Sequence, residues 1–432
     1  MCGVPLAPAA SAPAVAGDTG TGAAAGLAAA QLAANGIAVI FTAIFARVLG
    51  REDYGVLAAA LSTFLILSVP GYALQVAISR AVAVRSLGAH GELGATLRRW
   101  TSRLAAATLA LILAGALLRD PLARLLSVDA PWAAAATLPT VTLWVLLSVK
   151  RGVLAGLGEY RVVGLSIVGE AAGRLLLGLA LMLAGLGTTG AYLGTPLAMA
   201  VAALVLGRVL MRRDDSRAAL GAAAVRLRDL MREAVVPICA LALIAVLQNV
   251  DVIVVRHQLA EVQAGAYAAA AVAAKVVIWT AVGVALYVIP EAAGRTAVGR
   301  VARPVLLRAS AIVGAVAAPA LLVMALAPEL VLRLGFGPSY EVAADALPLL
   351  GVAMSVLALT YLTVNYLLAV GSSRFLAPLA IVALAEPVLL LAGSLDGLRS
   401  FAAVVLIVQL AAAGAVLVPT LRRAPAAAPA RA

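Results

Sequence analysis

The chain has 432 residues, of which 64% are hydrophobic and only 12% are charged, and its formal net charge at pH 7 is +12. A soluble domain cannot hide so large an apolar fraction in one core, so this composition excludes a soluble enzyme. Lipid is therefore the expected solvent for most of the chain. At about 20 residues for each crossing of a ~30 Å hydrocarbon layer, the length leaves room for about twelve transmembrane helices.

In chain order, the apolar runs predict six membrane spans in each half of the sequence. The runs are long and lack period-two alternation, which argues against the strands of a β-barrel. The first six predicted spans are residues 24–46, 56–79, 101–118, 132–149, 162–185 and 189–211. The second six are residues 233–255, 264–289, 304–327, 343–369, 375–393 and 400–421.

Positive charge divides unevenly between the two sides of these spans. The side that holds both termini carries 23 Lys and Arg residues, and the opposite side carries 7. By the positive-inside rule, both termini are predicted to be cytoplasmic. The net positive charge is therefore assigned to membrane topology and anionic lipid headgroups, and no nucleic-acid partner is expected.

Two pairs of short segments indicate that the second half repeats the first. Leu49–Ala60 aligns with Leu259–Ala270, and Gly158–Arg161 aligns with Gly371–Arg374 at nearly the same offset. Because six spans per half is an even number, both halves enter the membrane in the same sense. The predicted fold is an all-α integral membrane protein with two parallel six-helix repeats.

The same spans divide the chain into two lobes with a basic linker between them. Residues 1–23 are rich in Ala, Pro, Gly and Ser and contain no Lys or Arg, which predicts a disordered cytoplasmic tail and not a cleavable signal peptide. The other predicted segments are a lobe over residues 24–211, a linker over 212–232, a lobe over 233–421 and a cytoplasmic tail over 422–432.

Cysteine and histidine are too few to predict a site. Cys2 falls in the tail and Cys239 in a span, so no disulfide framework is expected. His90 and His257 are assigned to loops. The sequence therefore predicts no metal centre, no cofactor and no catalytic residue.

Ionisable side chains in the middle of a span mark the candidate functional site, because an Arg or Lys at that depth costs at least about 2.5 kcal/mol on insertion scales. Glu170 and Arg174 lie four residues apart in the fifth span and share a helix face. They are expected either to pair with each other or to present Arg174 to a central cavity. Lys275, in the eighth span, is expected either to bind an anionic substrate group or to pair with an acidic residue of another helix: Asp251, Glu386 or Glu170.

Other polar residues within the second half have alternative interpretations, one functional and one structural. Asp251, beside Asn249 near the outer end of the seventh span, is expected to titrate or bind a cation, or else to lie at a solvated or hydrogen-bonded helix end. Glu386 precedes a helix-breaking proline, which favours the same ion-exchange role. Tyr361 and Asn365, with Tyr366 beside them, form a polar stripe on the tenth span that meets sugar or water, or else packs against a helix.

Two segments resemble a known family. RVLGREDYGVLAAALST follows the first span, and the second span ends in Ile78–Ala81. The second half contains NVDVIVVRHQLAEVQAGAYAAAAVAAK, in which a membrane Asp and a short loop precede Ala-Gly-X-Tyr-X-X-Ala. The chain resembles the polysaccharide biosynthesis proteins, the lipid-linked oligosaccharide flippases of the multidrug/oligosaccharidyl-lipid/polysaccharide (MOP) exporter superfamily.

The resemblance implies a V-shaped bundle of two six-helix lobes that moves a polyprenyl-pyrophosphate-linked glycan from the inner to the outer leaflet by alternating access. A pyrophosphate needs cationic partners, so Arg174 and Lys275 are the expected binding residues. Arg47 and Arg80 are expected to guide headgroups or to snorkel to the interface. The implied setting is a bacterial cytoplasmic membrane during lipopolysaccharide or exopolysaccharide synthesis, with polysaccharide assembly proteins as partners.

The resemblance also implies coupling to H⁺, to Na⁺ or to the membrane potential. The candidate coupling residues are Asp251, Glu170 and Glu386, with Asn249 next to the first of them. No cofactor is implied beyond that ion.

Two other classes stay open. A MATE-like drug or cation antiporter of the same superfamily would share the architecture but favour an acidic or aromatic cavity, whereas this chain has only 4% aromatic residues. A membrane polysaccharide polymerase or ligase would need a large outer loop for its chemistry. The longest outer loops, near residues 119–131 and 328–342, are too short for a folded site.

Overall fold

The computed structural model describes residues 19–83, 93–127, 129–213, 235–297, 301–393, 395 and 397–421. These ranges are almost entirely helical and contain no β-strand. The first helix begins at Thr19, so the last residues of the predicted tail are helical. Residues 1–18, most of the predicted linker, His90 and the C-terminal tail lie outside the described residues.

The first half contains long helices joined by tight turns. Its first helix merges two rods at Gly50, whose backbone is not helical (φ 78°, ψ 179°). The elements of this half are α1 (Thr19–Leu67), α2 (Val69–Ala83), α3 (Leu93–Leu117), α4 (Arg119–Leu126), α5 (Pro131–Gly156), α6 (Tyr160–Leu181), η1 (Met182–Leu186) and α7 (Gly187–Arg213).

The second half has a similar succession. Its elements are α9 (Val235–Gln258), α10 (Glu261–Ala274), α11 (Val276–Ala297), α12 (Arg303–Leu326), α13 (Pro328–Gly335), η2 (Pro338–Ala343), α14 (Leu347–Ala369), α15 (Leu376–Ala392) and α16 (Leu398–Leu421). Two predictions differ from these elements. The predicted eighth span is broken at Lys275 into α10 and α11, and the predicted outer loops contain the short helices α4 and α13.

Every predicted span falls on helical segments, because the apolar runs that predict them are what a lipid-facing helix requires. The predicted second span, like the eighth, is divided between two helices, with the break at Ser68 between α1 and α2. In the described part of the chain, nine helices are long and apolar enough to cross a membrane. Two of these, Ala29–Val82 and Tyr160–Met211, have 54 and 52 residues. At about 20 residues for each crossing, each of the two is long enough to cross twice. The total of twelve crossings stays a prediction.

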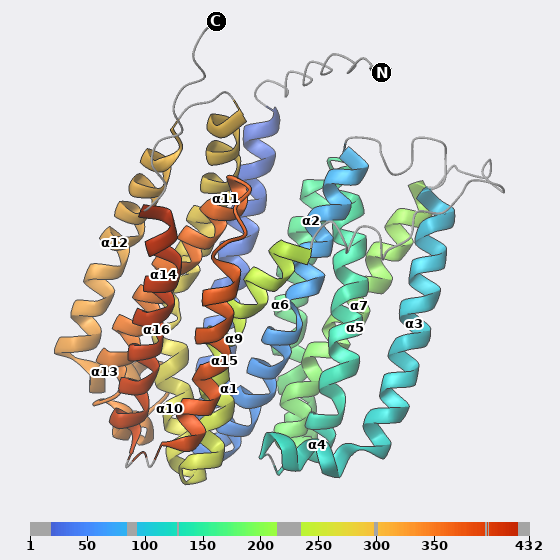
Figure 1. Ribbon diagram of the computed structural model, residues 1–432. Helices are drawn as coiled ribbons and strands as arrows, with labels where there is room; N and C mark the ends of the chain where they lie inside the picture. The colour runs from blue at the N-terminus through green and yellow to red at the C-terminus, as the bar shows by residue number, and fades with distance from the viewer. Residues whose placement is uncertain are drawn as a thin grey trace, which may run out of the picture.

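The helices of the two halves form two groups (Figure 1). The second-half helices α9 to α16 lie on one side and α2 to α7 on the other, with α1 between them, and α1 begins at the upper end of the view. Helix α1 packs against α6 and α7 of its own half and against α9 and α10 of the other. One continuous apolar cluster fills the second half, while the first half has smaller separate clusters. Helix α1 is therefore the main joint between the halves.

The aligned segments of the internal repeat occupy corresponding turns. Gly158 follows α5 with φ 83°, and Gly371 follows α14 with φ 71°, a left-handed conformation that favours glycine. The backbone hydrogen bonds of the two turns match, with Glu159 N donating to Leu154 O at 2.8 Å and Ser372 N donating to Leu367 O at 2.8 Å. This is the pattern of a Schellman helix end, and its recurrence supports the repeat.

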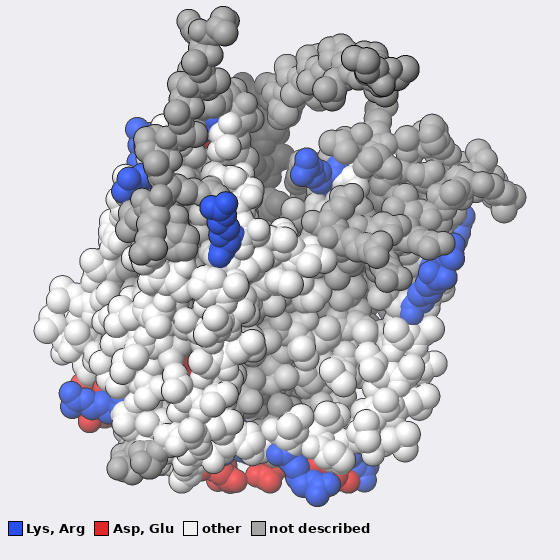
Figure 2. All heavy atoms as spheres, in the orientation of Figure 1, with Lys and Arg blue, Asp and Glu red and all other residues white. Residues whose placement is uncertain are grey.

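Charge avoids the middle of the molecule's visible face. In Figure 2 the central band is mostly white, and the coloured Lys, Arg, Asp and Glu side chains gather toward the upper and lower edges. A belt of uncharged atoms between two charged edges is the surface that a lipid bilayer requires.

Candidate functional site

Residues of α2 and α6 of the first half and of α14 of the second lie near one another around Tyr72, and we call this set the cleft surface. Tyr72 of α2 is 50% exposed. It nevertheless lies within electrostatic range of Glu170 and Arg174 of α6 and of Tyr361 of α14. Tyr72 is therefore accessible at a place where charged and polar groups of both halves lie near one another.

Arg174 of α6 belongs to this set through its position near Tyr72, and its predicted role in a cavity stays a prediction. Its side chain is partly exposed, and its guanidinium carbon lies 5.7 Å from the centre of the Phe41 ring of α1. A guanidinium over an aromatic face is held by cation–π attraction without losing its donors. Arg174 therefore keeps N–H groups available to an anion in the cleft.

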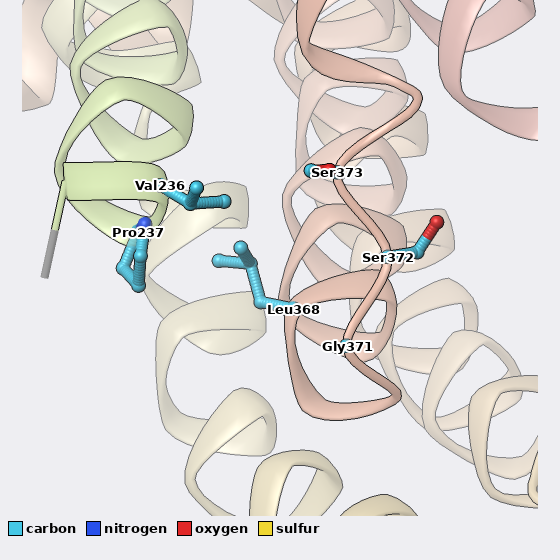
Figure 3. Close-up of a pocket in the computed structure, with 6 residues that line it drawn as sticks. All are labelled: Val236, Pro237, Leu368, Gly371, Ser372 and Ser373. Carbon is cyan, nitrogen blue, oxygen red and sulfur yellow. The ribbon is translucent and has the colours of Figure 1, made fainter. Parts of the chain in front are cut away.

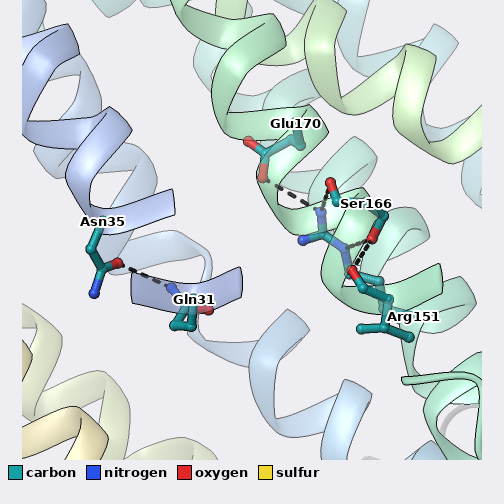
Figure 4. A network of polar contacts seen from close by, with 6 residues as sticks. Gln31, Asn35, Arg151, Ser166 and Glu170 are labelled. Atoms are coloured by element: carbon teal, nitrogen blue, oxygen red, sulfur yellow. Dashed lines mark hydrogen bonds and ion pairs between the residues drawn. The ribbon is translucent and has the colours of Figure 1, made fainter. Parts of the chain in front are cut away.

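Glu170 pairs with a different cation from the one that the sequence suggests. Its Oε2 lies 3.6 Å from Nη2 of Arg151 of α5, and both side chains are buried. The expected Glu170–Arg174 pair is therefore wrong for Glu170, because α5 presents a closer and more buried cation. Figure 4 shows this network, with Gln31 and Asn35 of α1 across from it and hydrogen-bonded to each other at 3.1 Å.

Sequence reasoning missed Arg151. The guanidinium donates from Nε to Ser166 Oγ at 2.9 Å and from Nη2 to the Ser166 carbonyl at 2.8 Å. The predicted fourth span ended at residue 149, which left Lys150 and Arg151 among the loop cations. Both are buried in α5, and Lys150 donates to the Ala203 carbonyl at 2.7 Å. The signal was present in the apolar residues Val153 and Leu154, which extend the helix face beyond the two charges.

A second group of polar residues lies inside the second half, and we call it the second-half cluster. Its members are Asn249, Asp251, Tyr267, Lys275, Glu386 and Gln409. They come from α9, α10, the break before α11, α15 and α16. All six are 6% exposed or less, and Asp251, Glu386 and Gln409 are fully buried.

Lys275 is the central cation of this cluster. Its Nζ donates to Asn249 Oδ1 at 3.0 Å, and it lies within electrostatic range of Asp251 and Glu386. The helix breaks at this residue, which caps α10 and precedes α11. The structure thus brings Lys275 together with two of the three acidic residues predicted as its partners, and places it inside the half and away from the cleft surface.

Several oxygen atoms of the cluster have no hydrogen-bond partner among the described residues. Tyr267 donates to Asp251 Oδ2 at 2.9 Å, but Oδ1 of the same carboxyl and both oxygens of Glu386 are unpartnered. Gln409 donates to the Leu247 carbonyl at 2.7 Å and leaves its own Oε1 free. Because Asp251 is fully buried, the solvated helix end expected for it is wrong, whereas the alternative of a hydrogen-bonded carboxyl agrees with the Tyr267 contact. Buried oxygens of this kind require a proton, a cation or water.

The other predicted site residues lie apart from these two surfaces. Asn365 is buried, and its amide donates to the Tyr361 carbonyl within α14 at 2.8 Å. Arg80 is exposed near the end of α2. Arg47 donates from Nη2 to the Leu334 carbonyl of the other half. The structure therefore brings Arg174, Glu170 and Tyr361 together at the cleft, and Asn249, Asp251, Lys275 and Glu386 together in the second-half cluster.

Contacts between the halves close the end of the bundle opposite to the start of α1. The hydroxyl of Tyr340 donates to the Ala46 carbonyl at 2.7 Å, and Arg256 Nε donates to the Ser127 carbonyl at 2.8 Å. His257, predicted as a loop residue, lies at the end of α9 with Nδ1 2.7 Å from Ser127 Oγ. Ser127 directly follows α4 and Tyr340 follows α13, two helices that lie toward the lower end of Figure 1, whereas α1 begins at the upper end.

One pocket of about 290 Å³ lies elsewhere, where α9 begins (Figure 3). It is lined by Val236, Pro237, Leu368, Gly371, Ser372 and Ser373. No lining residue is ionisable, so the pocket is not assigned to the transport site.

The long apolar helices of the described residues define a multi-pass helical membrane protein. The chain belongs to the polysaccharide biosynthesis protein family, whose model matches residues 23–293. No curated protein matches the sequence.

Solved structures of the MOP superfamily share the fold. An inward-facing multidrug resistance MATE family transporter matches with a TM-score of 0.73 and 18% identity, over 91% of this chain and 94% of that one. The lipid II flippase MurJ, in an inward closed conformation, matches with a TM-score of 0.73 and 12% identity, over 91% and 87%. A MOP superfamily transporter from Pyrococcus furiosus matches with a TM-score of 0.56 and 17% identity, over 93% and 95%. The predicted family and fold class are confirmed, while these identities carry no substrate assignment.

Proposed function

We propose that this protein is a flippase that moves a polyprenyl-pyrophosphate-linked oligosaccharide, or a related polysaccharide precursor, from the inner to the outer leaflet of a bacterial cytoplasmic membrane. The observation that carries the proposal is the accessible guanidinium of Arg174 at the cleft of a polysaccharide biosynthesis family protein. A guanidinium can hold phosphate oxygens in a bidentate way, which suits a pyrophosphate.

The cleft offers complementary groups for the rest of such a substrate. Tyr72 is half exposed, and Tyr361 of the other half lies within its electrostatic range. The buried Arg151–Glu170 pair, with its bonds to Ser166, fixes α5 against α6 below this surface. Arg174 would hold the pyrophosphate and the two tyrosines would contact the sugars. Arg80, exposed near the end of α2, would meet the headgroup at the interface.

The second-half cluster would couple transport to an ion. Two buried carboxyls with unpartnered oxygens, beside the fixed positive charge of Lys275, can exchange H⁺ or hold Na⁺ when the halves rearrange. Asn249 would orient Lys275 through the 3.0 Å hydrogen bond. This role removes Lys275 from direct contact with the pyrophosphate, which was one of its two expected roles.

Orientation follows from the charge asymmetry of the sequence. With 23 Lys and Arg residues on the side of the termini and 7 on the other, both termini would be cytoplasmic. The contacts between the halves would then close the outer end, and the cleft would receive its substrate from the inner leaflet. Glycan assembly enzymes on the cytoplasmic side would supply that substrate.

A second candidate function is a MATE-like antiporter of organic cations. The observation that favours it is the pair of buried carboxyls, Asp251 and Glu386, in the second-half cluster. The cation of Arg174 on the cleft surface argues against this function. The carboxylate described for the same surface, Glu170, is already paired with Arg151. A cationic drug would be repelled there.

A deletion strain tests the function. We expect lipid-linked oligosaccharide to accumulate on the cytoplasmic side and surface polysaccharide to fall, and a plasmid copy of the wild-type chain to restore both. Unchanged glycolipid and surface polysaccharide, together with increased sensitivity to cationic drugs, would instead support the antiporter.

A further inference from the structure

The two halves touch through the very segments that the internal repeat relates. Gly55 and Gly265 occupy the same position in the aligned segments Leu49–Ala60 and Leu259–Ala270. A Cβ built on Gly55 would lie 3.0 Å from the Cα of Gly265, so the two backbones cross in contact. A residue that meets its own repeat partner lies close to the axis relating the two halves.

The first half packs so closely against Gly265 that no side chain fits at this position. A Cβ there would overlap the main-chain carbonyl oxygen of Arg51, which belongs to the first half. A main-chain obstacle cannot rotate away as a flexible side chain can. At Gly55 the nearest atom is Nη1 of Arg256, at 2.9 Å, so the crowding there is partly with a movable group.

Side-chain contacts between the halves flank the glycine crossing. On one flank Tyr340 bonds to the Ala46 carbonyl, and its ring lies edge-on to Tyr54 with the ring centres 6.0 Å apart. On the other flank Arg256 bonds to the Ser127 carbonyl, and its Nη1 has no partner among the described residues.

Carboxylates of both halves surround Arg256. Glu52, Asp53 and Asp129 of the first half and Glu261 of the second half lie within its electrostatic range. One guanidinium therefore attracts acidic groups on both sides of the crossing, and its removal would leave them to repel one another across it.

We propose that the Gly55–Gly265 crossing is the gate that closes this end of the cleft, and that Arg256 stabilises the closed gate. The gate must open for a substrate to leave on this side, so a methyl group at residue 265 shifts the protein toward the conformer open at this end. The inference rests on the alternating access of the proposed function. Its readout is a distance between the halves and does not depend on the cargo.

Pulsed electron paramagnetic resonance on the full chain measures that distance. Cys2 and Cys239 are replaced by Ser, and spin labels are placed at D120C of α4 and L330C of α13, two exposed sites on opposite halves. The starting protein is expected to give one short-distance population. Gly265→Ala is expected to raise the ratio of long to short distances by about tenfold or more, and Gly55→Ala and Arg256→Gln by less.

Gly283→Ala is the matched control, because a Cβ at that helical glycine of α11 meets nothing within 4 Å. It should leave the distances unchanged. A folded Gly265→Ala protein with the short-distance population intact overturns the gate. If Gly265→Ala does not give monodisperse protein, unchanged distances in both Gly55→Ala and Arg256→Gln overturn it. Shifted distances in a chain that moves no glycolipid would support the gate and contradict the proposed cargo.

Discussion

The two halves of this protein treat their intramembrane charges in opposite ways. In the first half Glu170 is neutralised by Arg151, and Arg174 is left at the cleft over Phe41. In the second half Lys275 is sealed with Asp251 and Glu386, away from the cleft. Two copies of one helical unit have thus diverged, one toward presenting a cation to a ligand and one toward enclosing titratable groups.

The largest expected effect is a loss of stability when the buried cation Lys275 is removed. Lys275→Met leaves Asp251 and Glu386 buried without their counter-charge, which is expected to cost about 3 to 5 kcal/mol of folding free energy. Thermal unfolding of the full chain in detergent measures it. Adding Glu386→Gln to Lys275→Met should recover part of the loss, since the two groups interact. Equal stability of Lys275→Met and wild type would contradict the central place of Lys275.

Neutralising one sealed carboxyl should impair coupling. Glu386→Gln removes a group whose two oxygens are free to take up a proton or a cation. In proteoliposomes, gradient-driven transport is expected to slow at least about tenfold, the effect of ~1.4 kcal/mol, while substrate affinity is retained. The comparison between halves breaks down if Glu386→Gln weakens substrate binding and leaves the response to the ion gradient intact.

A smaller effect is expected at the exposed cation of the first half. Arg174→Ala should weaken binding of a polyprenyl pyrophosphate probe by about tenfold, through loss of charge-assisted hydrogen bonds, and Arg174→Lys should weaken it less. Binding measurements on the purified chain would give the dissociation constants of both variants. Arg124→Ala, at an exposed position in the last turn of α4, is the control and should bind nearly as wild type. Equal affinities for Arg174→Ala and wild type would remove Arg174 from the substrate site.

The smallest effect concerns a surface pair outside the spans. Arg333 Nε lies 2.6 Å from Glu341 Oε1, and this guanidinium lowers the pKa of the Glu341 carboxyl. A lowered folded-state pKa stabilises the fold above the unfolded value of about 4.3 and loses that contribution as pH falls through the folded value. Glu341→Gln should therefore flatten the acid limb of the Tm-against-pH curve, by no more than about 2 °C for so exposed a pair. A larger shift at neutral pH would contradict the small contribution assigned to this pair between α13 and η2.

The helices were predictable because each lipid-facing element needs a long apolar run, and such runs stand out in the sequence. The turns after α5 and α14 were also predictable as repeats, since each needs a residue that tolerates positive φ at Gly158 and Gly371. Local rules of this kind act within a few residues of the chain. Features that follow these local rules can therefore be predicted from the sequence.

Partner choice in the candidate site was harder to predict, because it depends on helix rotation and on neighbours far along the chain. Glu170 pairs with Arg151 of α5 and not with Arg174 on its own helix. Tyr267 and Gln409 join the second-half cluster from α10 and α16. Gln409, a single polar residue in a long apolar run, carried a signal, whereas nothing in the sequence aimed Tyr267 at Asp251.

The most direct test of the proposed function is translocation by the purified chain in liposomes that contain a fluorescent polyprenyl-pyrophosphate-linked oligosaccharide. An impermeant quencher reports how much of the probe reaches the outer leaflet, and Arg174→Ala serves as the matched variant. We predict that the wild-type chain moves the probe at least about tenfold faster than Arg174→Ala. Movement no faster than in protein-free liposomes, alongside gradient-driven uptake of a cationic dye, would contradict the flippase.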